Sequence, residues 1–271
     1  MSNNYFNAAI VLAAILIPLP CVAGQAEAKK IARALDSRDD GFRDSSAELV
    51  MTITNASGDA TQRKLQVKTL EVLNDGNRSL LSFSFPADIR GTALLSHSKF
   101  GDDDDQWLYM PAIKRIKRIS SRNKSGAFVG SEFSFEDLTD KYIEDYTYQE
   151  FGIEPCSFST DINGVISTVK SKCFVLERKP KNKFSGYSKE LLRFDTESYR
   201  IVTVEYYDIR GELLKLFTAE RFRIFKERYW RPMFSKMENK QTGKSTTLEY
   251  QSIQFGVGLQ ENDLSRTSLG R

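Results

Sequence analysis

The sequence predicts an α+β fold in which one curved antiparallel sheet forms an incomplete β-barrel covered by a few helices. About ten segments alternate apolar and polar residues with the period of two that is typical of strands. Tight turn sequences such as Asn74–Asn77 and Thr242–Lys244 lie between them, which favours antiparallel neighbours. Because a long sheet reduces its exposed edges by curling, we expect a half-open barrel.

The first 24 residues are typical of a secretory signal peptide. They carry no charged side chain, and the apolar run Ala8–Ile17 is too short to span a bilayer. We therefore expect export to the periplasm, with residues 25–271 left as a single domain because no linker or repeat divides them. An uncleaved anchor is the alternative, since residues 1–7 lack Lys and Arg. Lipid attachment at Cys21 is disfavoured, because proline precedes it where a small residue is needed.

The first element after the signal is an amphipathic helix at Glu27–Leu35, where apolar residues recur at helical spacing. It would cover the sheet or close the mouth of the barrel. Three strands then form an antiparallel meander, with alternating apolar side chains from Ala47 to Phe85. A short helical turn is expected within Glu136–Tyr142. Later strands are expected at Gly91–Ser98, Gln106–Met110, Lys114–Ile119, Phe133–Phe135, Thr168–Leu176, Lys189–Phe194, Ile201–Tyr207, Leu213–Phe225, Trp230–Asn239 and Ser245–Phe255.

The stretch Trp107–Leu138 is the most informative part of the chain. It begins with a short aromatic strand, continues with a basic strand and a polar turn, and ends with a second aromatic strand. Basic side chains on both faces of the middle strand suit an edge strand that is protected against aggregation. The same side chains could instead form a cationic rim that binds an anionic headgroup or an acidic partner. They are Lys114, Arg115, Lys117 and Arg118.

Aromatic residues are concentrated in and just before this stretch. Such side chains most often fill a core, but a curled sheet of this size can leave an internal space for them to line. Each CH₂ of an acyl chain bound there would contribute about 0.8 kcal/mol on burial. The candidate cavity-lining residues are Phe83, Phe85, Trp107, Tyr109, Phe128, Phe133 and Phe135.

The sequence contains no recognisable set of residues for catalysis, metal binding or cofactor binding. The one histidine, His97, has no Gly-x-Ser-x-Gly motif beside it and is expected to be structural. A zinc site needs three or four N or S ligands, and the spacing of Asp102–Asp105 does not match a calcium loop. Glu136 and Asp137 are better explained as the polar start of a helical turn than as an acid–base pair. A net charge of +3 argues against a dedicated nucleic-acid binder.

Two cysteines, Cys156 and Cys173, remain once the signal is removed. In an oxidising compartment such a pair predicts a disulfide, which would stabilise the fold by about 3 kcal/mol on the chain-entropy model. The alternative is a pair of buried free thiols.

Four segments resemble a known family. They read PADIRGTALL at Pro86–Leu95, WLYMPAIKRIKRIS at Trp107–Ser120, GAFVGSEFSFEDL at Gly126–Leu138 and YYDIRGEL at Tyr206–Leu213. Together they resemble the LolA-like, outer-membrane lipoprotein-sorting superfamily, and within it the branch associated with inner-membrane exporters of the resistance-nodulation-division type. The resemblance implies an incomplete β-barrel whose helices form a lid over an apolar cavity.

These observations and the resemblance predict a periplasmic carrier or chaperone rather than an enzyme. It would bind the acyl chains of a lipid or lipoprotein, make transient contact with a membrane and work with an inner-membrane exporter. The alternative is an accessory interaction protein of an exporter or envelope complex that transfers no ligand. A fold alone does not decide between these functions.

Overall fold

The computed structural model describes the backbone of residues 20–72 and 75–270, and the side chains from Gly24 onward within these ranges. Most of the expected signal peptide, residues 1–24, lies outside the described residues. The described α-helix and strands are α1 (Pro20–Ser37), β1 (Asp44–Thr54), β2 (Ala60–Leu70), β3 (Arg78–Phe85), β4 (Ala93–His97), β5 (Asp105–Met110), β6 (Arg115–Ile119), β7 (Tyr146–Ile162), β8 (Val165–Pro180), β9 (Tyr187–Asp195), β10 (Ile201–Asp208), β11 (Leu213–Phe225), β12 (Tyr229–Asn239) and β13 (Ser245–Phe255). None of the helices within these ranges is long and apolar enough to cross a bilayer.

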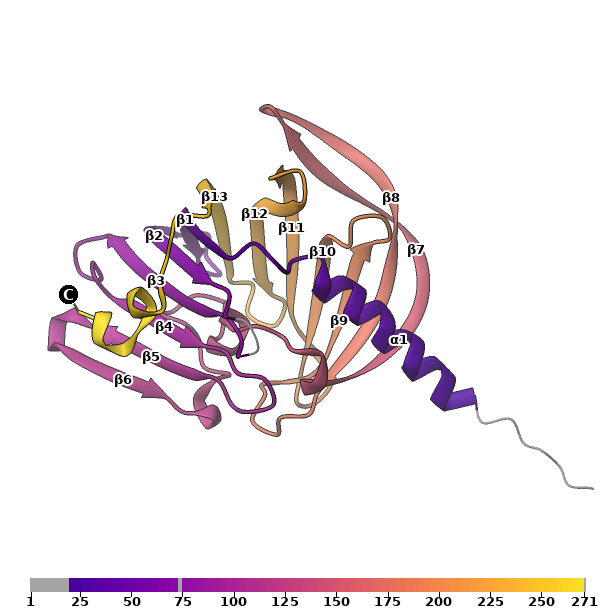
Figure 1. Cartoon of the computed structure of the whole chain (residues 1–271), viewed down its shortest axis with the longest axis horizontal. Coiled ribbons are helices and arrows are strands. Elements are labelled where there is room, and N and C mark those ends of the chain that lie inside the picture. The colour runs from indigo at the N-terminus through magenta and orange to yellow at the C-terminus, as the bar shows by residue number, and fades with distance from the viewer. Residues whose placement is uncertain (1–19, 73–74, 271) are drawn as a thin grey trace, which may run out of the picture.

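The strands form one large curved sheet, in the order β10-β9-β8-β7-β11-β12-β13-β1-β2-β3-β4-β5-β6 (Figure 1). Neighbours are antiparallel except β7 and β11, which meet through one parallel bridge between Thr160 and Phe222. The first part of β11 also pairs with β10. The predicted curved antiparallel sheet is therefore confirmed.

The basic strand β6 lies at one end of the sheet, where β5 is its only partner among the described strands. The prediction of an edge strand is thus confirmed. Lys114 precedes the strand in a left-handed conformation, with φ of 50°. It belongs to the turn before β6 rather than to the predicted strand Lys114–Ile119.

The predicted strand Phe133–Phe135 is wrong. Within the segment Gly126–Thr139, hereafter the crossing segment, only an isolated bridge joins Ala127 to Ser134. A 3₁₀ turn follows at Phe135–Leu138, in which the side chains of Ser134 and Asp137 cap each other's backbone N–H groups. The chain reverses at Val129 and Gly130, whose φ angles are 47° and 74°. This geometry buries Phe133 and Phe135 alike, so they do not alternate as strand neighbours would.

Helix α1 begins earlier than predicted and packs against the inner side of the sheet near β7. Its residues Ala28, Ile31 and Ala32 are buried in a core cluster with Leu176 and Tyr206 of the strands. The expectation of several covering helices is wrong for the described residues, since α1 is their one α-helix. The crossing segment supplies much of the remaining cover on the inner face, because Phe128 and Phe135 pack there against β1–β4.

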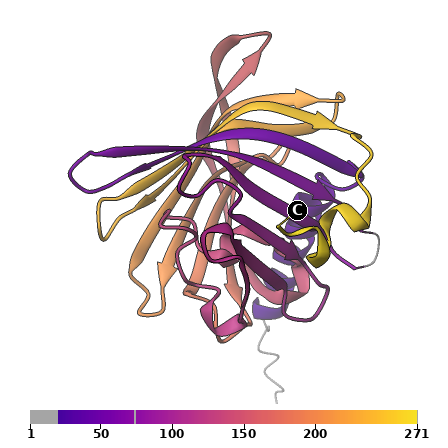
Figure 2. The same ribbon diagram turned by 90° about the vertical axis from the view of Figure 1, so that its left-hand side faces the viewer.

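The C-terminal residues 256–270 cover the opposite, outer face of β3–β5 (Figure 2). Leu264 and Leu269 pack there against Ala93 and Leu95, whereas Leu94 between them faces the inner cluster. Alternation along β4 thus gives this strand two buried faces.

The long hairpin of β7 and β8 carries the disulfide between Cys156 and Cys173, whose Cα atoms lie 5.8 Å apart. The predicted bridge is confirmed. It lies in a small core cluster with Phe158 and Phe222. Cys173 is the first residue of β8 that pairs with β9, and the hairpin extends beyond its neighbouring strands (Figure 1).

Candidate functional site

A hollow, hereafter the large hollow, lies between the end of α1 and the inner face of β7–β12. Its volume is about 1090 Å³, at the upper end of the range of roughly 300–1,000 Å³ for ligand sites. Part of its wall is a row of register partners on four strands, which follow one another as Leu176, Leu192, Val204 and Phe217. Because cross-strand partners share one face of a sheet, the row forms a continuous apolar surface.

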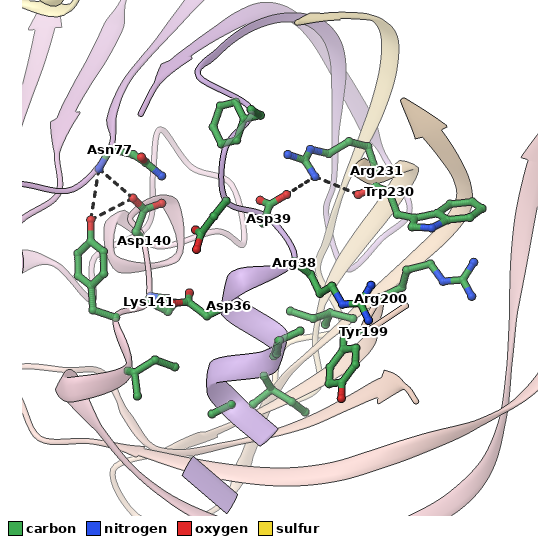
Figure 3. A pocket seen from close by; sticks show the side chains of 18 of the residues that line it. Asp36, Arg38, Asp39, Asn77, Asp140, Lys141, Tyr199, Arg200, Trp230 and Arg231 are labelled. Carbon is green, nitrogen blue, oxygen red and sulfur yellow. Dashed lines mark hydrogen bonds and ion pairs between the residues drawn. The ribbon is translucent and has the colours of Figure 1, made fainter. Parts of the chain in front are cut away.

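Charged residues gather where α1 ends and the chain enters the turn before β1 (Figure 3). Asp39 forms an ion pair with Arg231. Partial burial, reinforced by the neighbouring carboxylates of Asp40, Asp140 and Asp39, raises the pKa of Asp36 to about 6. This side of the large hollow is therefore polar, in contrast to its apolar strand wall.

Arg200 is held rigidly at the wall of the large hollow. Its Nε lies 2.9 Å from Asp195 Oδ1, and both side chains are almost fully buried. The guanidinium also stacks 4.5 Å from the ring centroid of Trp230. In contrast, Arg38 and Arg228 line the hollow with exposed side chains, and within the described residues neither has a carboxylate at ion-pair distance.

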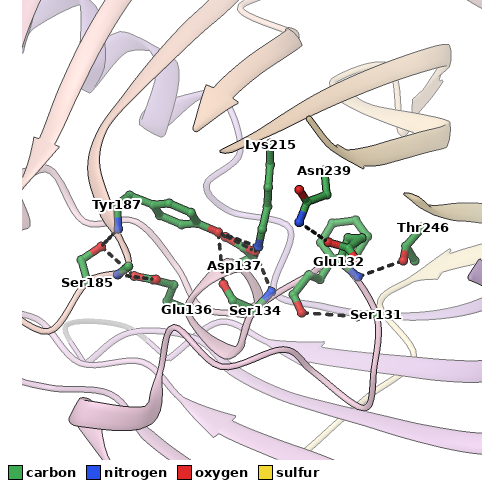
Figure 4. Close-up of polar contacts among 12 residues, drawn as sticks. Ser131, Glu132, Ser134, Glu136, Asp137, Ser185, Tyr187, Lys215, Asn239 and Thr246 are labelled. Carbon is green, nitrogen blue, oxygen red and sulfur yellow. Dashed lines mark hydrogen bonds and ion pairs between the residues drawn. The ribbon is translucent and has the colours of Figure 1, made fainter. Parts of the chain in front are cut away.

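The crossing segment is fixed inside the sheet by buried polar contacts (Figure 4). Asp137 accepts hydrogen bonds from the Tyr187 hydroxyl at 2.9 Å and from the Ser134 backbone N–H at 2.7 Å. The ammonium of Lys215 lies 3.5 Å from the same carboxylate, with both side chains largely buried. Burial and the charge of Asp137 raise the pKa of Tyr187 well above its ordinary value, so its hydroxyl stays a donor.

A second anchor lies one residue earlier. Glu136 accepts hydrogen bonds from the Gly186 backbone N–H at 2.9 Å and from the Ser185 hydroxyl at 2.8 Å. A Cβ at position 186 would lie 2.7 Å from Cβ of Ser125, so only glycine allows this close approach. Burial raises the pKa of Glu136. Both acidic residues of the turn are therefore structural anchors.

The crossing segment lies between two hollows. Asp137 and Thr139 line the large hollow, whereas Phe133 and Leu138 line another one of about 150 Å³. This small hollow is formed mainly by apolar side chains of β1–β4 and β13.

The structure places most of the expected cavity-lining aromatic residues in other roles. Phe83, Phe128 and Phe135 pack together in the core: the rings of Phe83 and Phe128 stack with centroids 5.7 Å apart, and those of Phe128 and Phe135 meet edge to face at 5.8 Å. Trp107 and Tyr109 pack on the outer face beneath the C-terminal segment. None of the seven lines the large hollow, and Phe133 alone lines the small one; the seventh, Phe85, is 46% exposed.

The expected basic rim is also separate from both hollows. Lys114, Arg115, Lys117 and Arg118 are exposed, and none of them lines either space. Arg118 forms an ion pair with Asp105 across the β5–β6 pair.

His97 joins the outer face of β4 to the C-terminal segment. Its Nε2 donates a hydrogen bond to the carbonyl of Leu264 at 2.6 Å, and its ring meets Trp107 edge to face. Over the described ranges, no three His, Cys, Asp or Glu side chains come together as metal ligands.

The residues that sequence reasoning missed are the strand positions of the large hollow and the arginines around it. Their alternation was visible, but it is the same in a packed core and in the wall of a hollow. Only the register of β8–β11 brings Leu176, Leu192, Val204 and Phe217 into one row.

The known proteins that this chain resembles belong to related families. A family model described only as an uncharacterized protein matches residues 75–271. A putative outer membrane lipoprotein-sorting protein domain from Vibrio parahaemolyticus is 42% identical, with a TM-score of 0.84 over 91% of this chain and 100% of its own. A DUF1329 family protein from Desulfovibrio piger is 26% identical, with a TM-score of 0.80 over 91% of this chain and 99% of its own.

A LolA superfamily protein from Nitrosomonas europaea shares the fold, with a TM-score of 0.68 at 21% identity over 89% of this chain and 99% of its own. No curated protein matches the chain. The Vibrio domain is similar over its full length, and it shares the curved sheet with this chain. We conclude that this chain belongs to the LolA-like, outer-membrane lipoprotein-sorting protein superfamily.

Proposed function

We propose that this protein is a carrier that holds the acyl chains of a lipid or lipidated molecule in the large hollow. The observation that carries the proposal is the apolar row from Leu176 to Phe217 beside about 1090 Å³ of unfilled space. An acyl segment of about a dozen CH₂ groups would gain roughly 10 kcal/mol on burial, before the costs of ordering and association. Binding of this kind needs no catalytic group.

The head of the cargo is proposed to lie near Arg38 and Arg228. Both are exposed at the large hollow, and neither is engaged by a carboxylate within the described residues. Arginine binds phosphate and carboxylate groups through paired N–H donors. An amphiphile with an anionic head would thus place its tail on the strand wall and its head beside these guanidinium groups.

The proposed setting is the periplasm, where the protein would exchange cargo with membranes in partnership with an inner-membrane exporter. The expected signal sequence and the disulfide support this location, because disulfides persist in oxidising compartments. The description of the Vibrio relative as a putative outer membrane lipoprotein-sorting protein domain supports the carrier role.

A second candidate is an accessory protein that binds an exporter or envelope complex without cargo. It is favoured by the edge strand β6, whose outer backbone groups have no neighbouring strand among the described residues and whose Arg115 and Lys117 are exposed. Replacing both residues by glutamate should abolish partner binding and leave lipid content unchanged if this function holds.

The direct test is mass spectrometry of lipids extracted from protein purified without detergent from a bacterial periplasm. Ala219 lines the large hollow, whereas its neighbour Glu220 is exposed. We expect bound lipid in the wild type and in the matched control Glu220→Trp, and little in Ala219→Trp, whose indole fills part of the space. A lipid-free wild type, or equal lipid in the two variants, would contradict the carrier function.

A further inference from the structure

The β7–β8 hairpin ends in an apolar tip that nothing in the described structure covers. Both ribbon views show the hairpin extending beyond its neighbours (Figure 1 and Figure 2). Ile162, Val165 and Ile166 flank its turn, and they are 57%, 68% and 57% exposed. A cluster of exposed aliphatic side chains at a projecting end is typical of a contact surface.

The charges behind the tip are positive. Between the two disulfide cysteines the one acidic residue is Asp161, which is neutralised by an ion pair with Arg223. Lys170 and Lys172 are exposed on β8, and neither has an ion-pair partner in the described part of the chain. At about 3.3 Å per strand residue, Lys170 follows Ile166 by roughly 13 Å. An apolar end with cations a short distance behind it complements an anionic bilayer, in which apolar groups enter about 5–10 Å.

The tip lies at the same end of the sheet as part of the large hollow. Strands β7 and β11 are parallel and meet at Thr160 and Phe222, so the ends of both strands point the same way. Phe222 lines the large hollow, as do Glu227 and Arg228 in the turn that follows β11. A surface touched by the hairpin tip would therefore lie close to the arginine that we place beside the cargo head.

The hairpin is also firmly joined to the wall of the hollow. The ring of Phe158 on β7 meets that of Phe222 edge to face, with centroids 5.8 Å apart. The Cys156–Cys173 disulfide lies in the same buried cluster and links the two strands. Contact at the tip would thus orient the hollow as well as the hairpin.

We propose that Ile162, Val165 and Ile166 insert into the surface of an anionic lipid bilayer and place the large hollow against it. This inference rests on the proposed carrier function, because docking would serve to exchange the cargo with the membrane. The observations that carry it are the exposed tip, the unpaired lysines and the parallel ends of β7 and β11.

The test is co-sedimentation of the full protein with phosphatidylcholine vesicles that contain 30% phosphatidylglycerol. Replacing Ile162, Val165 and Ile166 together by serine should lower the partition coefficient about 1,000-fold, at roughly tenfold for each of the three aliphatic side chains. The matched control is Ile209→Ser, which removes an isoleucine that is 78% exposed in the β10–β11 turn, at the other end of β11. This control should bind vesicles like the wild type.

Two further measurements keep the inference testable if the triple variant folds poorly. Lys170→Glu combined with Lys172→Glu should weaken binding to the anionic vesicles at least about tenfold, because each lysine near such a surface is attracted to its negative charge. In Val165→Trp, bromine-labelled lipids should quench the added indole emission relative to the wild type.

Several results would overturn the docking inference. They are a wild type that does not bind the vesicles, a triple variant that binds them normally, an equal loss in Ile209→Ser, and an added indole in Val165→Trp that the labelled lipids do not quench. Recognition of a protein by the tip, in place of lipid, would give the first of these results. If only the docking inference is wrong, the purified protein still contains lipid. If only the carrier proposal is wrong, the wild type contains no lipid but still binds the vesicles.

Discussion

Replacing Lys215 by methionine should destabilise the protein by about 3–5 kcal/mol, because it leaves the buried carboxylate of Asp137 without its cation. The side chains of Lys215 and Asp137 are only 10% and 3% exposed, so water cannot readily take over the lost interaction. The Tyr187 hydroxyl also loses a neighbour, since the Lys215 ammonium lies 3.1 Å from it. The crossing segment, which lies between the two hollows, would lose one of its anchors.

The assay is equilibrium unfolding in urea, followed by tryptophan fluorescence. The control is Lys240→Met, which breaks an ion pair of 2.7 Å to Glu238 in which both side chains are 34% exposed. That pair is shorter than the 3.5 Å pair of Lys215, but it is exposed and should be worth less than about 1 kcal/mol. Adding Asp137→Asn to Lys215→Met should recover part of the lost stability, because no uncompensated charge then remains.

The reasoning would be refuted if Lys215→Met cost no more than Lys240→Met. It would also be refuted if Asp137→Asn made the Lys215→Met protein still less stable by a further few kcal/mol. Either outcome would mean that burial of the charge does not govern the energetics of this anchor.

Three further perturbations have defined expected results. Replacing Cys156 and Cys173 by alanine should lower the free energy of unfolding by about 3 kcal/mol, and a melting temperature insensitive to reductant would contradict this. His97→Ala should cost about 1 kcal/mol and speed proteolysis after residue 255, because it removes the hydrogen bond to Leu264; unchanged cleavage would count against that role. The raised pKa of Asp36 means that the folded protein binds more protons than the unfolded chain between about pH 4 and pH 6, so stability should fall as pH rises through this window. Asp36→Asn should flatten that fall, and an unaltered slope would disprove the assignment.

Much of the sheet could be predicted because its strands alternate clearly. The predicted strands Leu213–Phe225 and Ser245–Phe255 have the bounds of β11 and β13. The prediction of a strand in the central aromatic segment is wrong because Phe133-Ser134-Phe135 alternates like a strand over only three residues. A Ser at position 134 with an Asp three residues later is also a capping pattern, and that signal could have identified the turn.

The site was harder to predict than the fold. Apolar strand residues look the same in sequence whether they face a packed core or a hollow, so the sequence does not show which of them line the large hollow. Which strands enclose space depends on long-range pairing, here the contact of β11 with both β10 and β7. The buried partners of Asp137 lie 50 and 78 positions further along the chain, at Tyr187 and Lys215, and no local pattern connects them.

The central claim is that the large hollow binds an acyl chain, and titration of delipidated protein with a fluorescent fatty acid tests it most directly. We expect saturable binding by the wild type and by Glu220→Trp, at one ligand per protein, and at least about tenfold weaker binding by Ala219→Trp. Binding that is absent in the wild type, or equally strong when position 219 carries the indole, would contradict the claim.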